Sequence, residues 1–441
     1  MRVLIIAYYF PPLAGGGVNR TLALVRGMTD AGLEPVVLTV DDAAWDRDPA
    51  LLGELSAGLR ILRLPNPDWG RVGSWRERGP SERAGRVTAT TGGRLRGWLV
   101  PDLCVGWSAL AAASAGAFAG TGAVDLVYTT SPPYSASWAG RLSRALGVPW
   151  VADFRDAWTD CPTRGWLPPW RARLERALER SVFRNADRVL FASEGARLRA
   201  LRREPRLAAH SETILTGYDP RAFAPVSDVV SAGNHFEIVH AGSINPTQRP
   251  YLERFLAGLE AWSATDPRVC KRVRVRFVGL GPDVAQSLAR PALTHWVAAE
   301  SRVGRRELTR LLRGAQLCLA FGSDAPCGGD PIPGKVFDAA GAGTPLLALV
   351  QPGALQRVVS EHALGSAVDP RASERLRSAL AEPFDAFVDA GESRGPAREP
   401  AASLENGHAV RRILQVLREV RWGDLERHDS EREACRYPSV S

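Results

Sequence analysis

The chain has 441 residues, enough for two domains of ordinary size, and an apolar fraction of 45% allows each a large core. Six scattered cysteines without a CxxC pair argue against a disulfide scaffold or a zinc site and indicate a reducing cytosol. The net charge of +8 fits nucleic acid or another anionic partner, but no zinc-finger, RRM or KH pattern is present. We therefore expect no nucleic-acid partner, but a cytoplasmic enzyme with phosphorylated substrates, with a peripheral place on the inner membrane face as an option.

The first residues are typical of a βαβ unit. The expected elements are an apolar strand at 2–7 that the chain enters without a signal peptide's longer apolar core, a glycine-rich loop, a helix at 18–28 and a strand at 35–40. Gly15, Gly16 and Gly17 invite a dinucleotide interpretation, but Arg20 stands where GxGxxG needs its last glycine, so no NAD site is predicted. Such a turn still lets a phosphate approach the backbone; the alternative is a flexible connection.

Two later stretches raise the question of a membrane. An arginine-rich segment runs from Arg71 to Arg96. We predict a solvated loop there; the alternative is a patch facing the membrane or an anionic acceptor, because basic residues near an anionic leaflet contribute roughly 1 kcal/mol each. Leu103–Val124 is an uncharged run long enough to span a bilayer, but its Ala, Gly and Ser residues insert poorly, and we predict a packed helix.

Polar side chains follow two predicted strands, at 125–130 and 149–153. The residues concerned are Ser131, Tyr134, Asp153, Arg155 and Asp156. Ligands of open α/β sheets bind beyond the carboxyl ends of strands, so we expect these side chains at a cleft.

The remaining elements divide the chain into two α/β halves. A helix at 170–187 is predicted to place Leu174, Leu178 and Val182 on one stripe, with Arg and Glu elsewhere. The first half closes with segments at 188–193 and 213–219, and a linker follows at 220–234. Strands of the second half are predicted at 236–243, 273–279, 317–321 and 346–350, followed by a helix at 407–421 and a charged, disordered tail at 424–441.

A stretch between the last two strands carries two acids and a lysine. Asp330 and Asp338 flank Pro333, which suits a first helical position, and Lys335 lies in the same turn. A helix start at Pro333–Gly334 would offer free N–H groups and a positive dipole to an anion. This layout suits a nucleotide sugar, which has phosphates in the middle and hydroxyls at both ends. The alternative is an ordinary helix start with a capping acid and a solvated lysine.

A metal site is not predicted. Asp46-Arg47-Asp48 is formally a DxD motif, but Pro49 follows it and no buried strand directly precedes it, so we interpret it as a solvated loop.

Together the motifs resemble those of retaining GT-B-fold glycosyltransferases of family 4. The phrases YYFPP, GGGVNR, TTSPPYS and VADFRDAW look like a bacterial subgroup associated with cell-surface polysaccharide or glycolipid synthesis. Asp330 and Asp338 resemble the family's carboxylate-x7-carboxylate signature, which usually has Glu at both ends. The resemblance implies an α/β GT-B fold of two Rossmann-like domains, an acceptor domain at 1–222 and a donor-nucleotide domain at 234–385. The active site is expected in the cleft between them, and the C-terminal helix on the first domain.

The resemblance also implies roles for individual residues. The first acid contacts hydroxyls of the donor sugar, and the second binds the nucleotide ribose. The family has Gly-Arg and then Lys where this chain has Gly242-Ser243 and then Arg249, and Lys335 is our hypothesis for the missing charge. Further donor contacts are implied at Gly15, Gly16, Gly17, Gly279, Gly281 and Gly334, and acceptor-side contacts at Asn19, Arg20, Ser131, Tyr134, Asp153 and Arg155.

The sequence thus predicts an enzyme that moves a hexosyl group, with retention, from a nucleotide diphosphate sugar to a hydroxyl of a glycan, glycolipid or small-molecule acceptor. The predicted catalytic residues are Asp330, Arg249, Lys335 and Asp156, with no cofactor beyond the co-substrate and no metal. No His precedes His210, which a retaining mechanism tolerates because the departing phosphate can take the acceptor's proton. Two alternatives stay open: a non-hydrolysing nucleotide-sugar 2-epimerase, and a catalytically silent GT-B binding partner.

Overall fold

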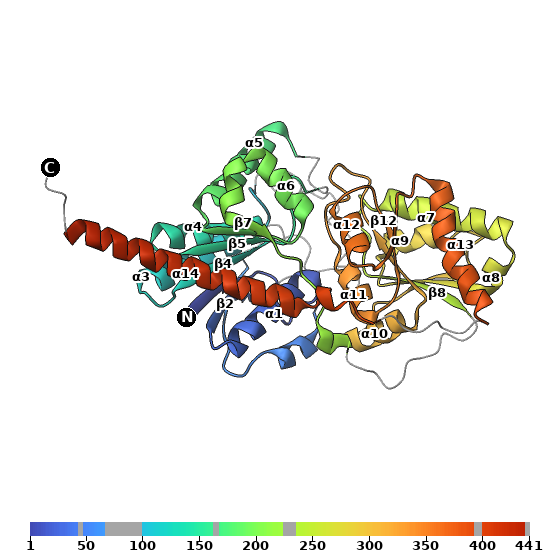
Figure 1. Cartoon of the computed structure of the whole chain (residues 1–441), viewed down its shortest axis with the longest axis horizontal. Coiled ribbons are helices and arrows are strands. Elements are labelled where there is room, and N and C mark those ends of the chain that lie inside the picture. Colours follow the sequence, from blue (N-terminus) through green and yellow to red (C-terminus); the bar gives the residue numbers. More distant parts are fainter. Residues whose placement is uncertain (43–46, 67–98, 162–166, 224–234, 392–398, 437–441) are drawn as a thin grey trace, which may run out of the picture.

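The structure, a computed structural model, describes residues 1–42, 47–66, 99–161, 167–223, 235–391 and 399–436. Two α/β lobes lie side by side along the long axis of the molecule, and the last helix returns to the first lobe (Figure 1). Asp46 and the whole of the arginine-rich segment, 71–96, lie outside the described residues.

The first lobe is built on a parallel sheet. Within the described residues, seven strands pair in the order β3-β2-β1-β4-β5-β6-β7. They are β1 (Arg2–Ile6), β2 (Glu34–Val40), β3 (Arg60–Leu64), β4 (Leu126–Ser131), β5 (Trp150–Phe154), β6 (Arg188–Phe191) and β7 (Ser211–Thr213). The chain leaves β1 toward β2 and β3 and returns to its other side at β4, so the switch point lies between β1 and β4, where loops at the carboxyl ends diverge.

Helices cover both faces of this sheet. They are α1 (Gly16–Asp30), α3 (Val105–Gly120), α4 (Ser137–Ala145), α5 (Pro169–Asn185), α6 (Glu194–Arg203) and the returning α14 (Asn406–Arg436). Successive residues of β1 enter different cores: Leu4 belongs to the cluster that contains α3 and α4 residues, and Ile5 to the cluster that contains Val416 and Leu417 of α14. This alternation explains why β1 is apolar at every position after Arg2.

The region considered as a membrane span is a packed helix. Trp107, Ala111 and Ala115 of α3 are fully buried against the first sheet. No helix among the described residues combines the length and the apolarity that crossing a bilayer requires.

The second lobe repeats the plan. Its described residues form a six-stranded parallel sheet in the order β10-β9-β8-β11-β12-β13. The strands are β8 (Phe236–Ala241), β9 (Val273–Val278), β10 (Val297–Glu300), β11 (Leu317–Phe321), β12 (Leu346–Leu349) and β13 (Gly365–Val368). The helices are α7 (Arg249–Thr265), α8 (Arg268–Arg272), α9 (Pro282–Ala285), α10 (Arg305–Gly314), α11 (Gly334–Ala342), α12 (Ala354–Glu361) and α13 (Ser373–Asp389). The switch point lies between β8 and β11, and two doubly wound sheets in series confirm the predicted α/β fold.

Two local expectations need correction. In α5, Val182 is buried as predicted, but Leu174 is 43% exposed, and Glu175 and Glu179 are buried in its place. Buried partners of the two glutamates, described below, decide this orientation. In the C-terminal region, α14 continues to Arg436, so the segment expected to be disordered from Asp424 is helical to that point. Its Glu and Arg residues are good helix formers, and the helix is already nucleated by packing on the first lobe.

Candidate functional site

The turn after β8 meets the start of α11 at the second switch point. Lys335 Nζ donates a hydrogen bond to the Ser243 carbonyl oxygen at 3.0 Å. Gly242 has a φ of +94°, and a Cβ added there would lie 3.4 Å from Lys335 Nζ. The left-handed backbone therefore favours a glycine at position 242, and the lysine lies within van der Waals contact of it. The contact places a cation beside a backbone turn at the carboxyl end of the central strands.

The start of α11 leaves its first N–H groups without a side-chain cap. Pro333 is the N-cap residue, and no side chain accepts a hydrogen bond there. Gly334, the first helical residue, is exposed. The helix ends at Gly343, whose φ of +67° gives the usual left-handed C-terminus. Uncapped N–H groups next to Lys335 give this corner positive potential.

The two titratable groups of α11 are shifted toward neutrality. Burial lowers the pKa of Lys335 to about 8, and the Asp338 carboxylate only partly opposes this. Burial raises the pKa of Asp338 to about 6, against the attraction of Arg305 and Lys335. At pH 7 both groups are mainly charged, and a pH change of about one unit in the appropriate direction half-titrates either of them.

His240 lies in β8, just before the turn that Lys335 contacts. Its side chain is 1% exposed and lies near the rings of Phe277 and Phe321. Nδ1 makes a 2.9 Å hydrogen bond to the Leu319 carbonyl oxygen, which fixes Nδ1 as the protonated nitrogen of a neutral ring. Burial, helped by the Lys335 charge, holds the pKa of His240 well below its ordinary value. The residue is thus a neutral packing element rather than a cation.

Arg249 is the first residue of α7, which follows the same turn. Its Nε is buried and makes no hydrogen bond within the described residues. The Nε atoms of Arg26, Arg155 and Arg310 share this property, and at Arg249 an incoming anion would supply the acceptor.

Asp330 faces the first lobe. Its carboxylate accepts a hydrogen bond from Arg199 Nε and a long one, 3.4 Å, from the Ala354 amide, and its carbonyl oxygen accepts one from Ser193 Oγ. A Cβ at Gly195 would stand 2.1 Å from Asp330 Oδ1, so this glycine allows the approach of the two lobes. The acid assigned to the donor sugar is therefore held by an arginine of the opposite lobe.

In the first lobe, Arg155 contacts several loops at the switch point. Its Nη2 donates to the Pro132 carbonyl oxygen, and its guanidinium lies 5.7 Å from the Tyr9 ring centre. A Cβ on Gly17 would be only 1.8 Å from Arg155 Nη1, so the start of α1 and Arg155 are in direct contact. The neighbouring Asp156 has its pKa raised by burial, with Arg155 opposing the shift. Loops after β1, β4 and β5 thus converge on one cation.

Other predicted acceptor-side residues are engaged within the first lobe. Arg20 and Asp153 form a buried pair, with Nε to Oδ2 at 2.8 Å and Nη2 to Oδ1 at 2.9 Å. Tyr134 stacks on Trp158 and donates its hydroxyl hydrogen bond to the Ala157 carbonyl oxygen. The remaining predicted residues lie as follows: Ser131 is the buried last residue of β4, Asn19 is half-buried in α1, Gly15 and Gly16 are exposed at its start, Gly279 (φ +82°) follows β9, and Gly281 precedes α9.

Two arginines at the contact between the lobes were missed. Arg199 of α6 binds Asp330, and Arg305 of α10 lies 3.5 Å from Glu54 of the first lobe while attracting the charge of Asp338. Neither belongs to a motif, and each has its partner more than a hundred residues away. A pattern along one chain therefore carries no signal for them.

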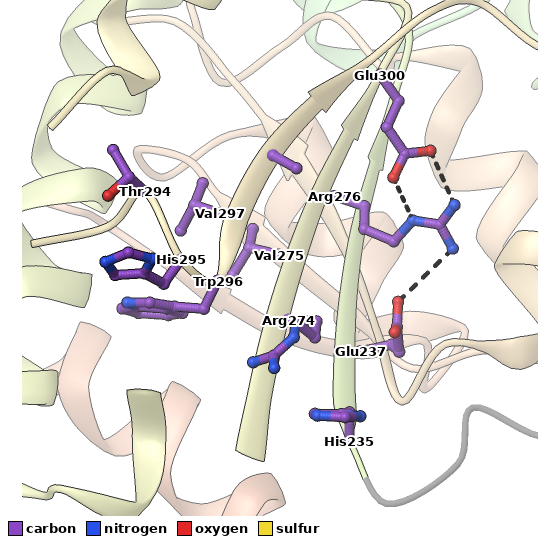
Figure 2. Close-up of a pocket in the computed structure, with 11 residues that line it drawn as sticks. His235, Glu237, Arg274, Val275, Arg276, Thr294, His295, Trp296, Val297 and Glu300 are labelled. Atoms are coloured by element: carbon purple, nitrogen blue, oxygen red, sulfur yellow. Dashed lines mark hydrogen bonds and ion pairs between the residues drawn. The ribbon is translucent and has the colours of Figure 1, made fainter. Parts of the chain in front are cut away.

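A pocket of about 310 Å³ lies elsewhere, against the starting ends of β8 and β9 and against β10. Figure 2 shows Arg276 between Glu300 and Glu237, with His235, Arg274 and His295 at the rim. Glu300 accepts two hydrogen bonds from Arg276, and Glu237 lies 3.8 Å from the same guanidinium. The positive charge of Arg276 is therefore already neutralised. The pocket lies away from the switch point, where Lys335, the Gly242–Ser243 turn and the start of α11 form what we call the Lys335 corner. In the described part of the chain, no three His, Cys, Asp or Glu side chains gather as a metal centre would require.

Comparison with known proteins bears on the family and the fold of the chain. Residues 15–211 match the family model described as a glycosyl transferase 4-like domain. Among curated protein sequences, none matches the chain.

Similar solved structures cover almost the whole chain. A sucrose-phosphate synthase from Thermosynechococcus elongatus has 18% identity and a TM-score of 0.63, covering 95% of this chain and 98% of its own. A glycosyltransferase from Rickettsia africae has 13% identity and a TM-score of 0.64, with the same coverage. An E. coli structure described as trehalose-6-phosphate bound with UDP-2-fluoro glucose has 11% identity and a TM-score of 0.62, covering 96% and 99%. At these identities the likeness establishes the fold, which is GT-B.

Proposed function

We propose that this glycosyltransferase, which carries a glycosyl transferase 4-like domain at residues 15–211, moves a hexosyl group from a nucleotide diphosphate sugar to a hydroxyl group with retention. The acceptor is a glycan, a lipid-linked sugar or a small natural product. The observation that carries the proposal is the Lys335 corner, where a cation, an uncapped helix start and a glycine turn meet at the switch point of the second sheet. The UDP-2-fluoro glucose in the similar E. coli structure supports a donor of this class.

The residues near the start of α11 are suited to stabilising a departing nucleotide diphosphate. As the bond between the anomeric carbon and the diphosphate oxygen breaks, its electron pair stays on the oxygen. Lys335, Arg249 and the amides at the start of α11 neutralise that charge. The acceptor oxygen bonds to the anomeric carbon on the same face, and its proton passes to the departing phosphate oxygen. Asp338 holds the ribose, Asp330 the sugar hydroxyls, and Arg155 with Asp156 the acceptor side.

The direct test measures binding first and turnover second. A thermal-shift panel of UDP-, GDP- and ADP-sugars should show one nucleotide class stabilising the protein, by about 2.7 kcal/mol at 100 times its dissociation constant. That donor should then release its nucleotide diphosphate with an acceptor present, and a chelator should leave the rate unchanged. Exchange at the sugar's C2 without an acceptor would favour the epimerase, and binding without any donor hydrolysis would favour a silent partner.

Replacement of Arg249 by alanine should lower kcat/KM about 10- to 100-fold. A charge-assisted bond to phosphate is worth about 1.5–3 kcal/mol, and the buried Nε has no other partner in the described structure. Steady-state kinetics with the identified donor measure the effect. Arg254→Ala, five residues farther along the same helix and paired with Asp324, is the matched control and should retain the wild-type rate. A near wild-type rate for Arg249→Ala would remove Arg249 from the site.

Replacement of Arg199 by alanine should lower kcat about tenfold, because Asp330 loses the partner that orients it across the lobes. Arg199→Lys keeps the charge and should recover part of the loss. In a double-mutant cycle, Asp330→Ala should make the Arg199 change almost silent, since positioning has no further target. Independent, multiplying effects would show that Arg199 does not act through Asp330.

A further inference from the structure

The acids of α5 both point inward, which is unusual for a surface helix. Glu175 is 0% exposed and Glu179 is 4% exposed. Glu175 accepts hydrogen bonds from Trp158 Nε1 at 3.0 Å and from Arg171 Nε at 2.9 Å. Glu179 accepts hydrogen bonds from Thr159 Oγ1 and from Arg203 Nη2, both at 2.7 Å. Both acidic side chains of α5 are thus paired inside the first lobe and leave no negative charge on its outer face.

The outer face of α5 is left with arginines and large apolar groups. Trp170 is 47% exposed and Leu174 is 43% exposed, one turn apart on the same stripe. Arg173 and Arg176 are exposed beside them and form no ion pair with any described residue. Farther along, Arg180 and Arg184 share one acid, Glu204. Figure 1 shows α5 at the edge of the first lobe, at the top of the view.

We propose that this outer face of α5, defined by Trp170, Arg173, Leu174 and Arg176, docks the protein on an anionic lipid surface. Basic side chains are drawn to an anionic leaflet, each raising the affinity roughly fivefold, and Trp settles at the boundary between headgroups and acyl chains. Nucleic acid would use the arginines but would leave Leu174 and Trp170 in water. The interleaving of exposed apolar groups with unpaired cations therefore favours a bilayer.

The proposal goes beyond the transfer reaction and does not need it, because docking is measured without donor or acceptor. The full chain is sedimented with vesicles of phosphatidylglycerol and phosphatidylcholine at about 0.1 M salt. Binding is expected to these vesicles and not to phosphatidylcholine alone. The double variant Arg173→Glu/Arg176→Glu should bind at least about 30-fold more weakly. Trp170→Ala should weaken binding too, and its effect should persist at about 1 M salt, where charge is screened.

The matched control reverses two exposed arginines of the second lobe. Arg357 of α12 and Arg375 of α13 form no ion pair within the described chain, so Arg357→Glu/Arg375→Glu changes the net charge equally. The vesicle binding of this control should stay within about twofold of wild type. Thermal unfolding should show that both double variants are folded. Three results would overturn the proposal. They are no binding of the wild type to anionic vesicles, the same loss of vesicle binding in both double variants, or binding to a DNA duplex that is as tight as to vesicles and depends on the α5 face.

Discussion

Substitution of Lys335 by alanine is expected to lower kcat/KM about 10²- to 10³-fold with the proposed donor. The lysine is the cation that touches the turn after β8, and it lies in the first turn of an uncapped helix. Removing one such group from a preorganised charge site costs about 2.7–4 kcal/mol of transition-state stabilisation. Its hydrogen bond is to a carbonyl oxygen that water can reach, so the variant should keep the wild-type unfolding temperature. Steady-state kinetics and a thermal melt measure the two quantities.

The pH dependence gives this prediction a sharper form. Protonated Lys335 is the binding form, and burial lowers its pKa to about 8, so kcat/KM should fall as the pH rises through about 8. Ionised Asp338 is the other required form, and its pKa is raised to about 6, so kcat/KM should fall as the pH drops through about 6. The expected profile is a bell between these values.

Two variants test which residue causes each limb of the bell-shaped pH profile. Lys335→Arg keeps its charge at all accessible pH values and should move the alkaline limb above pH 9. Asp338→Asn should remove the acid limb while lowering the plateau. An alkaline limb that stays near pH 8 in Lys335→Arg would contradict the role given to this lysine.

Substitution of Asp153 by alanine is expected to destabilise the protein by about 3–5 kcal/mol. The change would leave the Arg20 guanidinium buried without a carboxylate partner, although it would still donate to the Ile214 carbonyl oxygen. Both side chains of the pair are at most 3% exposed, and an unpaired charge at such a site is far costlier than the loss of an exposed ion pair. Urea unfolding of the wild type and the variant measures the difference.

The control for this pair replaces both partners. Arg20→Met/Asp153→Leu removes both charges and should recover most of the stability lost by Asp153→Ala, since apolar replacement of a buried pair is often neutral. The ion pair of Arg2 with Asp125, whose side chains are 43% and 21% exposed, offers a contrast: Asp125→Ala should cost only about 1 kcal/mol. An Asp153→Ala protein that keeps its stability but loses turnover would contradict the structural role and restore Asp153 to the acceptor side.

Orientation of individual side chains was the least predictable level. The helical spacing of Leu174, Leu178 and Val182 predicted an apolar buried stripe, yet Leu174 is exposed and Glu175 is buried. Periodicity assumes that acids prefer water. Here Trp158 and Arg171 offer Glu175 two hydrogen bonds inside the lobe, and those partners come from a loop and from the preceding turn. A spacing argument cannot weigh partners that the fold has yet to bring together.

The two α/β halves could be predicted from the amino-acid sequence, because runs such as Val3–Ile6 and Leu317–Phe321 are apolar at nearly every position, as is typical of central parallel strands. It also determined the Gly334–Lys335 helix start, whose proline, glycines and lysine are local signals. Which charged side chains form pairs became visible only in the folded protein. Arg199 with Asp330, Arg305 with Glu54 and Arg20 with Asp153 are each brought together by the packing of lobes or strands. Ion pairs form through space, and a single sequence records no distance between residues that are far apart along the chain.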